Sequence, residues 1–151
     1  MENIIKIVDT LLIDTNKLIN EKMTGVAYLE LFKFELINKF QSSDEHTVKE
    51  LQLIFSNKKY IENEISIDNK NIKYKIEFFD KSISKIKQKT ENDCLYLVLQ
   101  GQKNITIYNN NGDTKSLYCK MLKNMGVVLG LNTFITAEIM EKSIVLLILN
   151  K

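Results

Sequence analysis

The spacing of apolar residues changes near residue 50 and divides the chain into two parts. Over residues 3–19, apolar side chains recur three and four positions apart, which predicts an amphipathic helix that ends near Asp14. Residues 25–40 have an aromatic density that also suits a strand, but their apolar residues follow a helical spacing, so we favour a helix. The polar stretch that follows, "QSSDEH" at 41–46, predicts a break.

After residue 50 the apolar period falls to two, which is the period of β-strands. Short segments rich in β-branched and aromatic residues are separated by turn signals such as "DNKN" and "NNNGD". The expected strands are "LQLIF" at 51–55, "EISID" at 64–68, "IKYKIEFF" at 72–79, "CLYLVLQ" at 94–100, "NITIY" at 104–108, "SLYCKML" at 116–122, "MGVVLGL" at 125–131, "FITAEIM" at 134–140 and "SIVLLILN" at 143–150. The clearest hairpin spans 107–118, where Asn111-Gly112 tolerates the positive φ of a tight turn.

No helical pattern lies between these segments, so they predict a mainly-β sandwich or barrel. At 151 residues the chain has the length of one domain, which is enough to bury a core without disulfides. We therefore expect a single domain, in which an N-terminal helical segment (1–45) packs on a β-barrel (46–151).

Composition and charge narrow the class of protein. No apolar run approaches the roughly 20 residues that a membrane-spanning helix needs, and the acidic N-terminal stretch does not resemble a signal peptide, so we expect a cytoplasmic protein with no membrane partner. The net charge is +2, and all 21 basic residues are lysine. Because arginine supplies most forked contacts to phosphate and guanine, its absence argues against nucleic-acid binding.

The cysteines and the histidine suggest little chemistry by themselves. Cys94 and Cys119 are too few for a disulfide framework or a zinc site, so we interpret both as small buried hydrophobic residues. His46 is the only histidine and falls in the polar break, where we expect a solvated side chain.

Residues 72–150 resemble the motif-bearing part of a cupin, a small double-stranded β-helix. The first cupin motif has a His-x-His pair, four residues, a Glu, six residues and a Gly. Counting back from Gly101 places Lys87 and Lys89 at the two histidine positions and Cys94 at the glutamate position. "VVLGLNTFI" at 127–135 is similar to the turn of the second motif, with Ile135 at the position of the third histidine. The resemblance implies a cupin-like jelly-roll barrel and, since cupins often pair through their sheets, a homodimer.

The residues at the four ligand positions change the chemistry that the resemblance implies. Ammonium groups repel a metal cation and isoleucine has no lone pair, so we expect neither a metal nor another cofactor. The ending "GVVLGLNTFITAEIMEKSIVLLILN" is similar to that of sugar-nucleotide 3,4-ketoisomerases, which need no metal. Their catalysis uses imidazoles in the barrel, and this chain has no histidine in that region.

Lys87 and Lys89 admit two interpretations. Strand alternation places both on one face, with Gln88 on the other. If the cupin register holds, that face looks into the barrel, where two partly desolvated ammonium groups would bind an anion, or one would form a Schiff base with a carbonyl. If the strand is offset by one residue, or the side chains extend outward, both lysines are solvated.

Alternation from Cys94 continues through Tyr96 and Val98, which places a phenol inside the barrel. The candidate ligand-binding residues are thus Lys87, Lys89, Cys94 and Tyr96, with no assigned catalytic residue. Two functions follow. The first is a metal-free, non-catalytic cupin-like domain that binds a small anionic or carbohydrate ligand, or serves in assembly or regulation. The second is a metal-independent sugar-nucleotide isomerase or epimerase.

Overall fold

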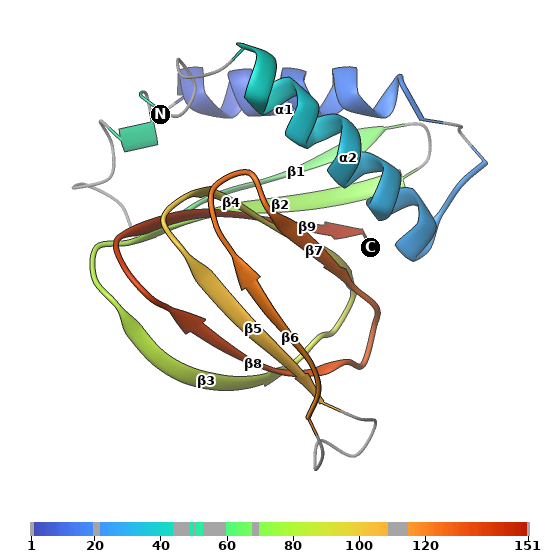
Figure 1. The fold of residues 1–151 in the computed structure, drawn as a ribbon. Helices are drawn as coiled ribbons and strands as arrows, with labels where there is room; N and C mark the ends of the chain where they lie inside the picture. The colour runs from blue at the N-terminus through green and yellow to red at the C-terminus, as the bar shows by residue number, and fades with distance from the viewer. Residues whose placement is uncertain are drawn as a thin grey trace.

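The computed structural model describes residues 2–19, 22–43, 49, 51–52, 60–67, 70–108 and 115–150. In these residues, two long helices precede a series of antiparallel strands (Figure 1). The elements are α1 (Glu2–Asn16), α2 (Gly25–Ser43), β1 (Tyr60–Ile67), β2 (Lys70–Phe79), β3 (Ile83–Lys89), β4 (Asp93–Gln100), β5 (Lys103–Tyr108), β6 (Lys115–Met121), β7 (Gly126–Leu129), β8 (Phe134–Ile139) and β9 (Ser143–Asn150).

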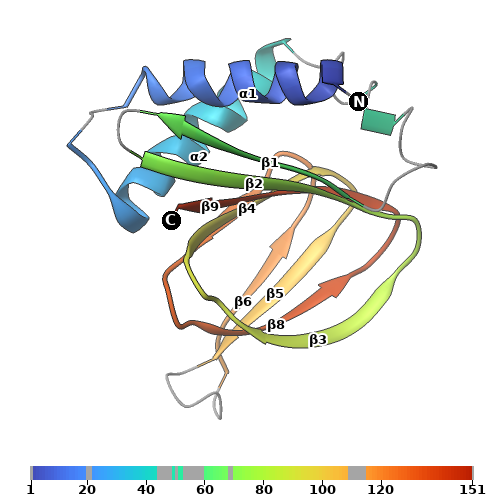
Figure 2. The same cartoon turned by 180° about the vertical axis from the view of Figure 1, so that it is seen from behind.

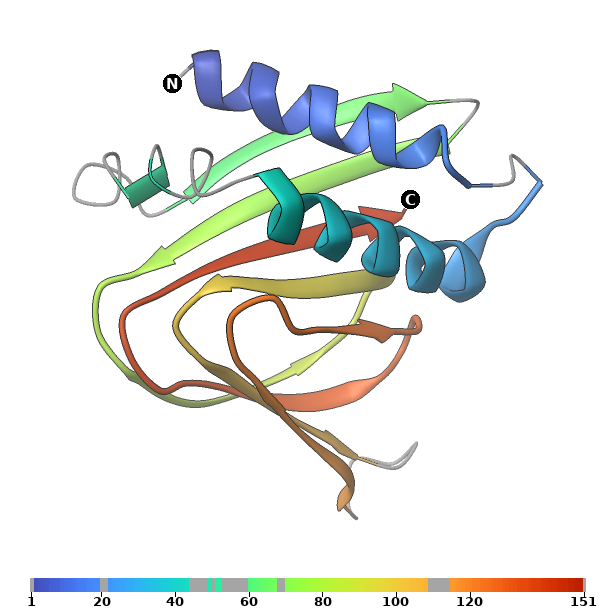
Figure 3. The ribbon, with the colours of Figure 1, turned by 45° about the horizontal axis from the view of Figure 1, so that its top comes forward.

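The described strands form two sheets that face each other. One sheet has five strands in the order β1-β2-β9-β4-β7, and the other has four in the order β3-β8-β5-β6. Both helices lie on the face of the five-stranded sheet that is turned away from the four-stranded sheet. Helix α1 lies beside β1, and α2 lies across β4 and β7 (Figures 2 and 3). The prediction of a mainly-β two-sheet fold with helices at the N-terminal end is confirmed.

The five-stranded sheet has a buried core on each of its faces. Leu95, Leu97 and Leu99 of β4 pack toward the helices, in the same core as Leu12 of α1 and Phe32 of α2. The alternate residues of β4 pack into the space between the two sheets. This two-sided burial explains why β4 is an almost unbroken apolar run instead of an alternating one.

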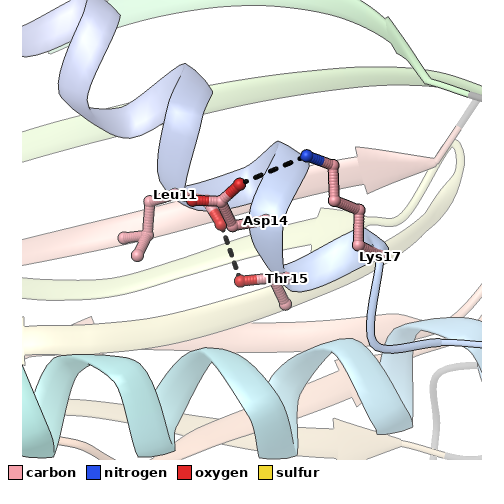
Figure 4. A network of polar contacts seen from close by, with 4 residues as sticks. All are labelled: Leu11, Asp14, Thr15 and Lys17. Carbon is pink, nitrogen blue, oxygen red and sulfur yellow. Dashed lines mark hydrogen bonds and ion pairs between the residues drawn. The ribbon is translucent and has the colours of Figure 1, made fainter.

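The helices bury the faces that their apolar spacing predicts. Ile4, Val8 and Leu12 of α1 are buried, and α2 confirms the helical interpretation of residues 25–40. The last turn of α1 carries a hydrogen bond of 2.7 Å from the Thr15 hydroxyl to the Leu11 carbonyl, and an exposed ion pair between Lys17 and Asp14 (Figure 4). The helix continues to Asn16, two residues beyond the expected end.

A partly buried polar cluster ties α1 to the sheet. The Asp9 carboxylate accepts a hydrogen bond of 2.8 Å from the Tyr74 hydroxyl of β2 and bonds of 3.0 and 3.1 Å from the Asn63 amide of β1. Burial and the bond to Asp9 raise the pKa of Tyr74, so its hydroxyl stays protonated and donates.

Two expected elements differ from the structure or lie outside it. Leu51 and Gln52 are helical, so the expected strand at 51–55 is wrong for these two residues, and the other three lie outside the described residues. Periodicity cannot separate a short apolar run in a strand from one in a buried helix, and Leu51 is fully buried in the helix-side core. The Asn111-Gly112 turn also lies outside the described residues, although the strands around it pair as an antiparallel hairpin.

The turns at one end of the barrel are joined by Thr90. Its hydroxyl donates a bond of 2.6 Å to the Gly130 carbonyl and accepts one of 2.8 Å from the Thr133 amide. Asn132 has a φ of 64°, consistent with the turn expected there. Neither α1 nor α2 combines the length and apolar character needed to cross a bilayer.

Candidate functional site

The structure places Lys87 and Lys89 on the outer face of the four-stranded sheet. Both are exposed, and they pair with Thr136 and Phe134 of β8. The Lys89 ammonium lies 5.1 Å from the centre of the Phe134 ring. The two lysines share one face, as alternation predicts, but the expectation that this face looks into the barrel is wrong.

Gln88 takes the inward position on β3 instead. Its side-chain amide donates a hydrogen bond of 3.1 Å to the hydroxyl of Tyr96, and it pairs with Ile135, which is buried between the sheets. The β3–β8 register shifts between Ile83 and Ile86, so the alternative of a one-residue offset is confirmed. Gln88 nevertheless stays exposed, so its side chain contacts Tyr96 while it keeps access to solvent.

Cys94 and Tyr96 face the interior, as predicted. Both belong to the core between the sheets, together with Val98. Burial raises the pKa of the Cys94 thiol to about 11, against the lowering effect of the nearby Lys103 charge. Burial also raises the pKa of Tyr96, so its hydroxyl is a proton donor at neutral pH. Neither group therefore acts as an anion at neutral pH.

Lys103 is the functional candidate that the sequence interpretation missed. It begins β5, pairs with Ile139 and Met121, and is only 4% exposed. Its ammonium lies 3.9 Å from the centre of the Tyr96 ring, across the space between the two sheets. Among the residues that the structure describes, the Tyr96 ring is the contact found for this ammonium, and no fully enclosed side-chain nitrogen or oxygen lacks a hydrogen-bond partner, so the ammonium is open to a cavity. A lysine that is this little exposed and opens to a cavity is unusual and marks a candidate binding site.

The pKa of Lys103 is lowered to about 8 from an ordinary value of 10.5. Burial is the main cause, because it penalises the charged form, and the Glu77 carboxylate acts in the opposite direction. Lys103 therefore changes its charge close to physiological pH.

A cavity of about 310 Å³ is lined by Lys87, Gln88 and Lys89 among others. Two other cavities are lined by Tyr96. One, of about 250 Å³, lies between the sheets and has five polar side chains on an otherwise apolar wall. These are Lys75, Glu77, Gln88, Tyr96 and Lys103. The other, of about 210 Å³, lies at the β3–β4 turn and is lined by Cys94 and Lys89 among others. Gln88 and Tyr96 line both cavities, so their hydrogen bond separates them.

The charges around the cavity of about 250 Å³ between the sheets favour an anion. It is lined by two ammonium groups and one carboxylate. The Lys75 ammonium lies 4.4 Å from the centre of the Tyr60 ring at the rim, while Lys103 lies at depth. Within the described residues, no three His, Cys, Asp or Glu side chains come together as a metal site would need. His46 lies outside the described residues.

A signal for Lys103 was present in the sequence. Counting by two along "KNITIY" places Lys103 on the same face as Ile105 and Ile107, and that face is buried. The strand expected from the sequence begins at residue 104 and so omits this first inward position.

Comparison with solved structures identifies the architecture. A cupin-2 domain-containing protein from Shewanella frigidimarina aligns over 74% of this chain and 99% of its own, with a TM-score of 0.50 and 12% identity. CENP-C of Drosophila melanogaster, solved bound to CAL1, aligns over 71% of this chain and 97% of its own, with a TM-score of 0.50 and 12% identity. A cupin superfamily protein from Desulfitobacterium hafniense aligns over 62% of this chain and 78% of its own, with a TM-score of 0.45 and 15% identity.

The chain matches no protein-family model and no curated protein. The structural likeness concerns the fold, and it confirms the expected cupin-like jelly-roll barrel. At 12% identity it speaks for the fold alone.

Proposed function

We propose that this cupin-fold chain is a metal-free, non-catalytic binding domain that holds a small carboxylate between its two sheets. The observation that supports this most directly is the Lys103 ammonium, which belongs to a side chain only 4% exposed, lies against the Tyr96 ring and opens to a cavity.

A carboxylate would offset a cost that the free protein bears. Removing an ammonium from water is unfavourable unless a counter-charge or hydrogen bonds replace the lost hydration. The Tyr96 ring supplies part of this through a cation–π contact. A bound carboxylate would supply the rest with a charge-assisted hydrogen bond.

The Tyr96 hydroxyl can also donate to the ligand. The Gln88 amide donates to the phenol oxygen, so the phenol proton is available to a second acceptor. One carboxylate oxygen would accept this hydrogen bond, while the other oxygen of the same carboxylate accepts one from the Lys103 ammonium.

The cavity size favours a small acid over a sugar nucleotide. Pockets for drug-sized ligands occupy roughly 300–1,000 Å³, and this cavity has about 250 Å³. A sugar nucleotide would have to leave most of its surface outside. The isomerase or epimerase function is therefore the weaker candidate, and a neutral carbohydrate would leave the Lys103 charge uncompensated.

Assembly is the second candidate. Leu117 and Tyr118 on the edge strand β6 are 55% and 59% exposed, which suits a contact surface. The Drosophila protein with a similar fold was solved with a protein partner. A homodimer formed through sheet faces would have to use the four-stranded sheet, because α1 and α2 cover the other one.

Calorimetric titration with pyruvate, lactate and glycolate at pH 7 tests the carboxylate proposal. We expect binding to the wild type, and Lys103→Met to weaken it by roughly tenfold or more because a charge-assisted hydrogen bond is lost. Lys87→Met is the matched control, since it removes a lysine on the outer face. Unchanged binding in Lys103→Met, or loss in Lys87→Met alone, would contradict the proposal.

A further inference from the structure

We propose that Lys103 forms an imine with the carbonyl group of a small aldehyde or keto acid bound in the cavity between the sheets. This inference rests on the proposed function and specifies its ligand class: a carboxylate that also carries an aldehyde or ketone. In such a ligand the acid group pairs with Lys75, and the carbonyl group takes the place beside Lys103 and Tyr96 that the acid of a simple carboxylate would occupy.

The geometry gives the Lys103 amine access to such a ligand. The side chain lines the cavity of about 250 Å³ together with Lys75 and is only 4% exposed. The Tyr96 ring covers one side of the nitrogen at 3.9 Å, and no described carboxylate forms an ion pair with it. The nitrogen is thus held in place without being blocked by a counter-charge.

A second ammonium can hold the acid while Lys103 reacts. Lys75 lies on the five-stranded sheet, in a register row with Leu147 of β9 and Tyr96 of β4. Its ammonium reaches the rim over the Tyr60 ring, so a carboxylate there would leave the carbonyl end directed toward the deeper Lys103. Two cationic groups at different depths suit a ligand with an acid at one end and a carbonyl at the other.

The amine has a reactive fraction at neutral pH. With a pKa of about 8, roughly one Lys103 in ten is neutral at pH 7, against about one in three thousand for an ordinary lysine. Only the neutral amine has the lone pair that attacks a carbonyl, so Lys103 has an advantage over exposed lysines.

The reaction balances without an oxidant or a reductant. The neutral Lys103 nitrogen forms a bond to the carbonyl carbon while the C=O π electrons move to oxygen. A proton passes from nitrogen to oxygen, and the product is a neutral carbinolamine. The C–O bond then breaks with protonation of its oxygen, which releases water and leaves a protonated imine with the charge on nitrogen.

Tyr96 is placed to donate the proton that this oxygen needs. Burial raises the pKa of Tyr96, so its hydroxyl remains protonated. The Gln88 amide donates a hydrogen bond to the hydroxyl oxygen. The only proton on the phenol is thus directed to another acceptor. Water from the cavity can return the proton to the phenol after dehydration.

Reductive trapping tests the inference on the intact chain. The protein is incubated at pH 7 with glyoxylate and sodium cyanoborohydride, and carboxymethylated lysines are located by peptide mass spectrometry. We expect Lys103 to be labelled at least about tenfold faster than the exposed lysines, and Lys103→Met to lose only that label. Tyr96→Phe should slow labelling of Lys103 by about tenfold, because it keeps the ring and removes the proton donor.

Glycolate separates this inference from the proposed function, because it has the same acid group without a carbonyl. Glycolate binding with no preferred label at Lys103 would overturn the imine and leave the binding proposal standing. Equal labelling of Lys103 and of exposed Lys87 would also overturn it. Absence of both glycolate binding and a Lys103 label would overturn the two proposals together.

Discussion

The Lys103 ammonium lies 3.9 Å above the centre of the Tyr96 ring, and this contact joins the two sheets of the barrel. Lys103 comes from the first position of β5 and Tyr96 from the middle of β4, so the pair bridges elements of different sheets. The contact holds a cation between an apolar core and a cavity whose wall also carries Lys75, Glu77 and Gln88. Such a pair stabilises less than an apolar pair would, unless a ligand uses its charge.

Stability should depend on the charge of Lys103. Its pKa is about 8 in the folded protein and near 10.5 when unfolded, so the unfolded state binds more protons between these values. The free energy of unfolding therefore rises with pH through this window, and the full penalty, about 3 kcal/mol, is present below pH 8. Urea unfolding at pH 7 and pH 9.5 measures the change.

Lys103→Met should remove this dependence and be at least as stable as the wild type at pH 7, because methionine has a similar length and no charge. Lys87→Met should keep the wild-type dependence. The assigned burial of the ammonium would be contradicted if the free energy of unfolding of the wild type rises between pH 7 and pH 9.5 by no more than that of Lys103→Met.

Cys94 should resist thiol reagents in the folded protein. Its pKa is raised to about 11 and its side chain is 2% exposed, whereas Cys119 is half-buried. At pH 8 only about one Cys94 thiol in a thousand is ionised. Titration with Ellman's reagent should therefore modify Cys119 first and Cys94 only on unfolding, with Cys119→Ser as the control. Rapid modification in Cys119→Ser would instead make Cys94 a candidate nucleophile.

Gly101→Ala should destabilise the barrel strongly. Gly101 has a φ of +88°, and an added Cβ would lie 2.5 Å from the Lys142 carbonyl oxygen. Backbone strain and the steric clash together should cost about 2–4 kcal/mol in denaturant unfolding. Gly130→Ala is the matched control, because the nearest atom to its added Cβ is 3.7 Å away, and it should cost less than about 1 kcal/mol. Equal costs would contradict the described β4–β5 turn.

Asp9→Ala should loosen α1 from the sheet. It removes the acceptor of the buried Tyr74 hydroxyl and of the Asn63 amide, which should cost about 2–3 kcal/mol. Asp14→Ala removes only the exposed pair with Lys17 and should cost less than about 1 kcal/mol. Amide hydrogen exchange along residues 2–16 would show whether the loss is local. A result in which both variants unfold alike would contradict the anchoring role of Asp9.

Much of the fold could be predicted because each strand carries its own evidence. The alternation of β2 and the apolar runs of β4 and β9 reflect burial on one face or on two, which is a local property of the sequence. The same alternation placed Cys94, Tyr96 and Val98 correctly in the interior. The order of the strands in the two sheets could not be predicted in the same way, because pairing between distant segments leaves no local pattern.

The site was predicted only in part, because its geometry depends on register. Between Ile83 and Ile86 the β3–β8 pairing shifts. Because of this shift, Gln88 faces inward and Lys87 and Lys89 face outward. No residue type in "DKSISKIKQK" signals this shift. Lys103 could not be predicted because a lysine at a strand end usually extends to solvent. It is enclosed by Tyr96 of β4, which lies in the other sheet, and the sequence around Lys103 does not indicate that contact.

The most direct test of carboxylate binding at Lys103 is to observe the lysine side chains during ligand binding. In protein labelled with [ε-¹³C]lysine, the Lys103 signal can be assigned by its absence from Lys103→Met and then followed by NMR as lactate is added at pH 7. Lactate cannot form an imine, so only binding is measured. We predict that the Lys103 signal shifts and that its pKa rises when the carboxylate pairs with the ammonium, while Lys87 and Lys89 stay unchanged. Shifts at Lys87 and Lys89 with a constant Lys103 signal would contradict the account and move the binding site to the outer face of the barrel.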